Sequence, residues 1–196
     1  MDLCIAAINK KWTFASKYQL IYFMNIGDRL PAFSLPGVNG EMHNQYEYAD
    51  RYALLIMFTN NSCPVSAAYR SRIKALLKRY EEDNLGIIRV NSTAKNSPSE
   101  SMVEMKKLYD ELNLSHVYVM DEDQEFAKLF GAAKVPEAYL FNSKRELVYK
   151  GAIDDCWENE SMVTRVYLED AIEAALDGID VDYPEVTAVG CDIDFQ

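Results

Sequence analysis

Short, wholly apolar runs along the chain predict the strands of a β-sheet. The clearest run is Ala53–Phe58, six consecutive apolar residues, which is the length and composition of a strand buried on both faces. Further apolar runs predict strands at 86–90, 117–120, 138–141 and 147–150, the last two joined as a hairpin by a polar turn. Near the start, residues 33–43 predict a small hairpin around the turn 37–40, which contains two glycines and an asparagine.

Apolar residues at three- and four-residue spacing predict helices between these strands. The stripes cover 65–80, 102–112, a short segment around 126–130, and a closing helix from Met162 to Leu176. Pro64 suits the first turn of the first helix, where a missing N–H costs nothing. Strands separated by helices, followed by a hairpin and a helix, indicate an α/β domain. The absence of a GxGxxG turn or a P-loop pattern argues against nucleotide-binding folds of those types.

The length of 196 residues predicts one domain with short appendages. Lysines interrupt the first two dozen residues, so we expect 1–24 to be an extension outside the domain rather than a signal peptide. The domain is expected at 25–178 and a C-terminal tail at 179–196. No apolar run approaches the length of a membrane span, so no membrane association is expected.

The net charge of −11 is concentrated toward the end of the chain. Residues 151–196 hold thirteen acidic side chains and one basic side chain, Arg165. An acidic surface repels phosphate backbones, so a nucleic-acid partner is not expected. A solvated acidic face that aids solubility is the simpler interpretation.

The cysteines and histidines give no metal-binding pattern. The four cysteines lie far apart, which argues against a zinc site and against a disulfide framework, and favours a reducing, cytoplasmic compartment. His43 and His116 are isolated, and the acidic run 121–123 lacks the rest of a calcium loop and is expected to cap a helix. No metal and no cofactor are expected.

Cys63 is the strongest candidate for chemistry. It follows the buried strand and immediately precedes a helix, where unpaired N–H groups and the helix dipole stabilise a thiolate, the nucleophilic form. Cys191 lies in the tail and is a candidate to resolve an oxidised Cys63 through a disulfide, with an inert tail thiol as the alternative. Cys156 lies among carboxylates, which disfavour the thiolate, and Cys4 lies in the extension.

Several segments, taken in order, resemble a known family. Residues 27–37 (GDRLPAFSLPG) resemble the opening of the alkyl hydroperoxide reductase/thiol-specific antioxidant group of the thioredoxin superfamily, and 58–64 (FTNNSCP) resembles its active-site loop. The loop is most similar to a peroxiredoxin-like bacterial subgroup with the sequence FTCNHCP. Further similar stretches are 131–132, 135–136, 148–151, 153–155 and 188–191. The resemblance covers residue 25 to the end. It implies a thioredoxin-like fold, a central mixed β-sheet flanked by helices, with Val135–Pro136 cis and facing Cys63.

The resemblance also shows a departure in the active-site loop. The subgroup has a CxxC pair where this chain has Asn60-Asn61-Ser62-Cys63, so dithiol exchange within the loop is impossible. Peroxiredoxins carry a threonine three residues before the reactive cysteine, at the place of Asn60, while Thr59 lies one residue earlier. The Asn60 amide is a candidate to donate a hydrogen bond to thiolate or peroxide. The stabilising arginine of peroxiredoxins has no clear match, with Lys134 a weak substitute.

The sequence therefore predicts a thiol-dependent antioxidant oxidoreductase, with a peroxiredoxin-like peroxidase as the leading interpretation. Cys63, Asn60, Thr59 and Cys191 are the expected catalytic residues, and Pro64, Val135 and Pro136 the expected substrate-binding residues. The partners would be a peroxide or a small thiol or disulfide, and an external thiol reductant such as a thioredoxin. Two alternatives stay open: a monothiol disulfide-exchange enzyme, and a binding module that has lost catalysis. The oligomeric state is also open, with a homodimer among the alternatives.

Overall fold

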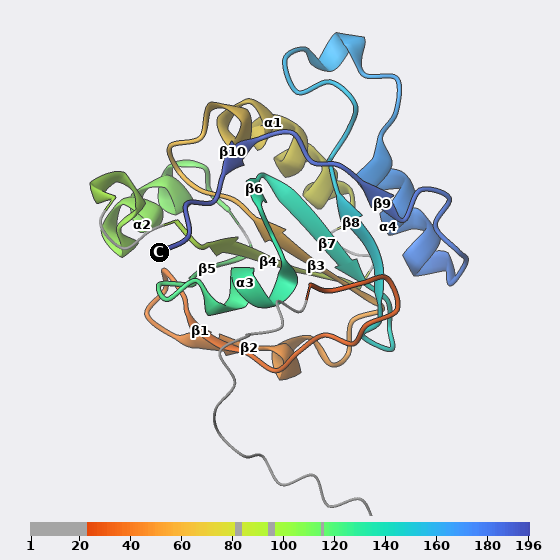
Figure 1. Cartoon of the computed structure of the whole chain (residues 1–196), viewed down its shortest axis with the longest axis horizontal. Helices are drawn as coiled ribbons and strands as arrows, with labels where there is room; N and C mark the ends of the chain where they lie inside the picture. Colours follow the sequence, from red (N-terminus) through yellow and green to blue (C-terminus); the bar gives the residue numbers. More distant parts are fainter. Residues whose placement is uncertain (1–22, 81–83, 94–96, 115) are drawn as a thin grey trace, which may run out of the picture.

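A six-stranded mixed β-sheet forms the centre of the molecule (Figure 1). The computed structural model describes residues 23–80, 84–93, 97–114 and 116–196. The strand order is β5-β4-β3-β7-β8-β9. β3 is parallel to β4, and β4 to β5; β7 is antiparallel to both β3 and β8, and β9 runs parallel to β8. The strand bounds are β3 Ala53–Phe58, β4 Leu85–Asn91, β5 Val117–Met120, β7 Glu137–Phe141, β8 Leu147–Gly151 and β9 Glu185–Val186.

Helices and a hairpin cover the two faces of this sheet. Figure 1 shows α1 (Pro64–Arg79) and α4 (Tyr167–Asp177) on one side, and α3 (Glu125–Phe130) with the β1–β2 hairpin on the other. The hairpin pairs β1 (Ser34–Pro36) with β2 (Met42–Asn44), and α2 (Met102–Glu111) lies next to β5. This is the thioredoxin-like α/β architecture that the sequence predicts.

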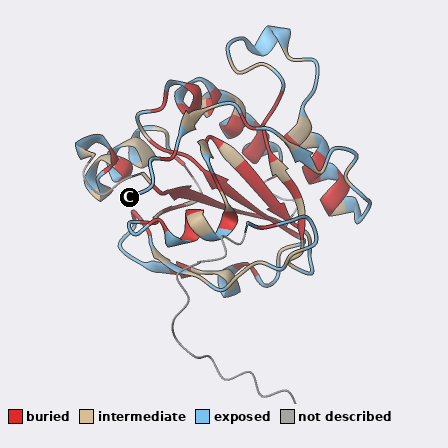
Figure 2. Ribbon diagram, in the orientation of Figure 1, coloured by how far each residue is buried: buried red, intermediate tan, exposed pale blue. Residues whose placement is uncertain are grey.

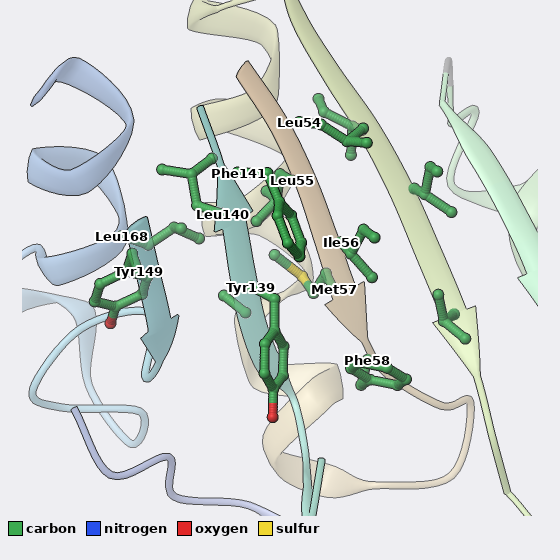
Figure 3. Packing of buried hydrophobic residues seen from close by; sticks show 14 of the residues in the cluster. Leu54, Leu55, Ile56, Met57, Phe58, Tyr139, Leu140, Phe141, Tyr149 and Leu168 are labelled. Atoms are coloured by element: carbon green, nitrogen blue, oxygen red, sulfur yellow. The ribbon is translucent and has the colours of Figure 1, made fainter. Parts of the chain in front are cut away.

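The core is apolar throughout β3, whose six residues are all fully buried. Figure 2 shows the central strands as a continuous buried layer. Alternate residues of β3 point to opposite faces, as expected for a strand. Phe58 packs edge-on against Phe130 and Tyr139, with ring centroids 5.4 and 5.5 Å away, while Met57 and Leu55 belong to the same cluster (Figure 3). Burial on both faces fixes the carboxyl end of β3, where the loop 59–63 begins.

The first helix and five of the six strands of the main sheet lie within one or two residues of their predicted positions; β9 is not among the predicted strands, and the closing helix begins later than predicted. It begins at Tyr167, whereas the predicted stripe begins at Met162. Residues 160–162 form a separate 3-10 turn capped by Asn159, and Met162 is exposed. Asp155 accepts hydrogen bonds from the backbone and hydroxyl of Thr164, which holds this stretch as a loop.

The ends of the domain are better integrated than the sequence predicts. The side chain of Met24 is buried in the core and its carbonyl accepts a hydrogen bond from Lys150, so the described part of the domain includes residues 23 and 24. The rest of the predicted extension, including Cys4, lies outside the described residues. The tail supplies β9 to the main sheet, and β10 (Cys191–Asp192) pairs with β6 (Lys134–Val135). Within the described residues no helix is long and apolar enough to cross a bilayer.

Candidate active site: a cysteine pair beside a cis-proline

Cys63 lies at the N-cap of α1 and forms a disulfide with Cys191. The two Cα atoms are 6.0 Å apart, although 128 residues separate the cysteines in sequence. Cys63 is only 2% exposed. Pro64 occupies the first helical position, so the helix starts immediately after the sulfur-bearing residue. The structure thus brings together the two cysteines that the sequence singles out.

Asn60 folds back over the loop and bonds to it rather than extending into solvent. Its Oδ1 accepts the backbone N–H of Cys63 at 2.9 Å, and its Nδ2 donates to Thr93 Oγ1 at 3.1 Å. Thr59 is buried, and its N–H donates to Val90 O, which continues the β3–β4 pairing by one residue. The structure therefore shows both residues shaping the loop that presents Cys63.

Glu100 is a buried carboxylate that the sequence analysis does not identify as part of the site. It is the last residue of the 3-10 turn Pro98–Glu100 and reaches the active-site loop, where it accepts the N–H groups of Asn61 and Ser62, both at 2.8 Å. It also accepts the side-chain amide of Asn91 at 2.8 Å. Charge-assisted bonds to backbone N–H groups are stronger than neutral ones, so Glu100 fixes the loop conformation.

Two further side chains hold Asn61 in place. Arg70 of α1 donates to the Asn61 carbonyl at 2.7 Å, and the Tyr118 hydroxyl donates to Asn61 Oδ1 at 3.1 Å. Burial raises the pKa of Tyr118 well above its ordinary value, so its hydroxyl stays protonated and able to donate. The loop is therefore anchored to β4, β5 and α1 together.

The peptide bond between Val135 and Pro136 is cis, as the resemblance implies. The Val135 carbonyl oxygen lies 3.3 Å from Cys63 Sγ, so this segment forms one wall of the site. Glu137, the next residue, accepts the N–H of Ala133 at 3.1 Å and that of Lys134 at 3.4 Å. Burial raises the pKa of Glu137. These bonds fold residues 133–137 into a compact arch, which carries β6.

The C-terminal tail forms the other wall of the site, because it pairs with residues 133–137. β10 is antiparallel to β6, with Cys191 opposite Val135 and Asp192 opposite Lys134. Gly190 passes so close that a Cβ there would lie 2.2 Å from the Val135 carbonyl oxygen, which only glycine avoids. Lys134, the weak substitute for the peroxiredoxin arginine, forms an ion pair with Asp192 at 2.6 Å.

A cavity of about 210 Å³ continues from this wall along the tail. Its lining joins Pro136 and Val189 to side chains of α1 and of the loop after β8, among them Tyr69, Ile153 and Trp157. The loop is pinned by Asp154, which accepts hydrogen bonds from Tyr69 at 2.7 Å and Arg72 at 2.6 Å. The cavity therefore lies beside the cis-proline, and three aromatic side chains, those of Tyr69, Trp157 and Tyr167, contribute to its mixed lining.

The remaining candidates lie apart from this chemistry. Cys156 is a free thiol whose sulfur lies 3.9 Å from Glu158 Oε2. His43 is buried between Glu47 and Asn39 in the hairpin. Asp121 accepts the N–H groups of Phe126 and Ala127, the helix-capping role predicted for the acidic run. Among the described residues no cluster of three or more potential ligands could hold a metal ion.

Comparisons with known proteins bear out the fold. A hypothetical protein from Sinorhizobium meliloti is 30% identical, with a TM-score of 0.83, over 88% of this chain and 96% of that one. An uncharacterized conserved protein from Geobacillus kaustophilus is also 30% identical, with a TM-score of 0.82, over 88% of this chain and 93% of that one. A putative thiol:disulfide interchange protein from Chlorobium tepidum shares the fold at 18% identity, with a TM-score of 0.63, over 78% of this chain and 99% of that one.

No curated protein sequence matches the chain. The model of the AhpC/TSA family matches residues 26–150, a range that contains the hairpin, the loop with Cys63, the cis-proline and the β7–β8 hairpin. With a cysteine at the start of α1, a cis-proline beside it and a family model that matches more than half of its length, this chain belongs to the AhpC/TSA family of thioredoxin-like proteins.

Proposed function

We propose that the protein is a two-cysteine thiol peroxidase, in which Cys63 reacts with peroxide and Cys191 resolves the product. The observation that carries this proposal is the Cys63–Cys191 disulfide at the N-terminus of α1. A thiolate at this place is stabilised by the helix dipole, and it is the reactive form of the thiol. Membership of the AhpC/TSA family supports a peroxide as the oxidising substrate.

The proposed cycle has three steps. The Cys63 thiolate attacks one oxygen of the peroxide, the O–O bond breaks, and the second oxygen leaves as an alcohol or water after taking up a proton, which gives a sulfenic acid on Cys63. The Cys191 thiol then attacks the Cys63 sulfur, the S–O bond breaks, water leaves, and the disulfide forms. An external dithiol reduces the disulfide and is itself oxidised, which restores both thiols.

The structure favours a second candidate oxidant, a disulfide, for one specific reason. The N–H groups of Asn61, Ser62 and Cys63 are already bound by Glu100 and Asn60, so they stabilise the loop instead of a departing oxygen. Peroxide activation would then depend on donors other than these three N–H groups. Exchange with a disulfide needs no such activation, since its leaving group is a thiolate.

The decisive experiment follows Cys63 after mixing reduced protein with hydrogen peroxide or with an oxidised dithiol. For a peroxidase we expect rapid loss of the Cys63 thiol in peroxide, followed by a Cys63–Cys191 disulfide in peptide maps. In the Cys191→Ser variant the sulfenic acid should accumulate and pass to sulfinic acid. Slow peroxide oxidation with fast disulfide exchange would contradict the peroxidase and support the second candidate. A Cys63 inert to both oxidants would leave only a binding role.

A further inference from the structure

Gln124 has an unusual environment for a polar residue that lies outside the active-site loop. It lies between β5 and α3, is 3% exposed, and adopts a left-handed backbone conformation with φ of 60°. Residues other than glycine seldom adopt this conformation, and when they do the surrounding contacts usually hold them there. The contacts of the Gln124 side chain therefore hold this backbone conformation in place.

The Gln124 amide makes three hydrogen bonds, two of them to the tail. Its amide nitrogen, Nε2, donates to Ser92 O and to Asp194 O, both at 2.8 Å, and its amide oxygen, Oε1, accepts the N–H of Gln196 at 2.9 Å. An amide offers two donor hydrogens and an acceptor at one end of the side chain. A carboxylate of the same shape has no donors, so it would face two carbonyl oxygens without a hydrogen bond.

These bonds hold the tail three and five residues beyond Cys191 without involving sulfur. The adjoining contacts are also independent of the disulfide: the N–H of Ile193 donates to Ala133 O at 2.9 Å, and the Ile193 side chain is buried in the main core. Reduction of the disulfide breaks only the S–S bond. The tail therefore keeps these anchors, all of them C-terminal to Asp192, when the cysteines are thiols.

We propose that Gln124 is a positioning residue, which clamps the tail so that the Cys191 thiol stays beside Cys63 in the reduced protein. This inference rests on the proposed two-cysteine cycle and explains how resolution proceeds without a search by a free tail. The nearby thiol reaches the Cys63 sulfenic acid before a second peroxide does, which protects Cys63 from sulfinic acid.

The test measures the effective concentration of the cysteine pair by equilibration with glutathione. In this equilibrium the protein dithiol and glutathione disulfide give the protein disulfide and two glutathione thiols. We expect Gln124→Glu to lower the effective concentration at least tenfold and to raise the sulfinic fraction of Cys63 after peroxide. Gln124→Gly, which suits the left-handed backbone and adds no charge, should act in the same direction.

Two controls separate positioning from general damage. Gln45→Glu makes the same exchange at a residue that accepts the Phe33 N–H in the distant hairpin, and should leave the effective concentration unchanged. In the Cys191→Ser background, Gln124→Glu should leave the oxidation rate of Cys63 unchanged. An unchanged effective concentration in both Gln124 variants would overturn the proposal, as would an equal loss in Gln45→Glu or a matching loss of Cys63 reactivity. Because the glutathione equilibrium needs no peroxide chemistry, it can fail or succeed independently of the peroxidase assignment.

Discussion

The two halves of the cysteine pair are held by different kinds of structure. Cys63 lies at the end of the loop that joins a fully buried strand to a sixteen-residue helix, and this loop is bound by the buried carboxylate of Glu100. Cys191 sits on a two-residue strand held by short pairing with β6, an ion pair and the Gln124 amide. One thiol is therefore built into the core, while the other is docked onto it. This difference predicts that Cys63 stays reactive when the tail is changed, whereas Cys191 cannot carry out its role when Cys63 or its loop is changed.

The largest expected effect tests this asymmetry directly. Cys63→Ser should abolish peroxide consumption, a loss of about 10³-fold or more, because it removes the nucleophile. Cys191→Ser should leave the first oxidation of Cys63 within about twofold of the parent, since it removes only the resolving thiol. Rapid-mixing measurements of thiol loss distinguish the two, with Cys156→Ser as a control. Equal loss in both variants would mean that the two cysteines act as a single unit.

Glu100 provides the next test, on the core-anchored half. Glu100→Ala leaves the N–H groups of Asn61 and Ser62 and the Asn91 amide without their acceptor, and we expect a loss of about 3 kcal/mol in the free energy of unfolding. Urea denaturation of the parent and the variant measures this loss. Glu100→Gln should recover part of the loss, because its carbonyl still accepts one N–H. Glu104→Ala, at a half-buried position in α2 where the carboxylate pairs with the exposed Lys107, is the control and should cost less than about 0.5 kcal/mol.

The free energy of unfolding should also depend on pH, through His116. Burial, with a smaller contribution from the charge of Arg89, lowers the pKa of His116 to about 4. The unfolded chain has the ordinary value of about 6.5, so between these values the unfolded state binds more protons and the folded state loses stability as pH falls. The loss has a limit of about 1.4 kcal/mol per pH unit, and about 3 kcal/mol over the whole interval.

The measurement compares the parent with His116→Gln in denaturation curves from pH 7 to pH 4. The unfolding free energy of the parent minus that of the variant should decrease as pH falls, since only the parent carries the titrating imidazole. Glu137, whose raised pKa acts in the opposite direction, is present in both proteins and cancels in the difference. Parallel pH profiles would show that His116 is free to protonate in the folded state.

The smallest expected effect comes from the ion pair between Lys134 and Asp192, which helps to hold the tail that carries Cys191. Lys134 and Asp192 are 36% and 80% exposed, and exposed pairs contribute about 0.5 kcal/mol or less. Lys134→Ala should therefore lower the effective concentration of the cysteine pair about twofold, and 1 M salt should remove the difference. A larger change would show that the ion pair, not the Gln124 amide, is the main anchor of the tail.

The sequence by itself determined the scaffold and the first thiol. The apolar run Ala53–Phe58 predicts a central strand, and the cysteine and proline that follow predict the start of a helix, because composition, length and backbone preferences favour both. The resemblance added the cis bond before Pro136. These features depend on residues close in the chain or on a pattern shared across the family.

The tertiary structure alone decided what surrounds the thiol. Glu100 binds Ser62, 38 residues away, and Gln124 binds Asp194, 70 residues away, and their types and spacing give no local signal. Asn60, an expected donor to peroxide, is bound by groups whose approach depends on the β3–β4 pairing and the start of α1. The closing helix starts late because the bonds from Tyr69 and Arg72 to Asp154, together with the local bonds between Asp155 and Thr164, hold 154–164 as a loop. Periodicity describes how a segment buries one face, but hydrogen bonds between distant segments exist only once the sheet has brought those segments together.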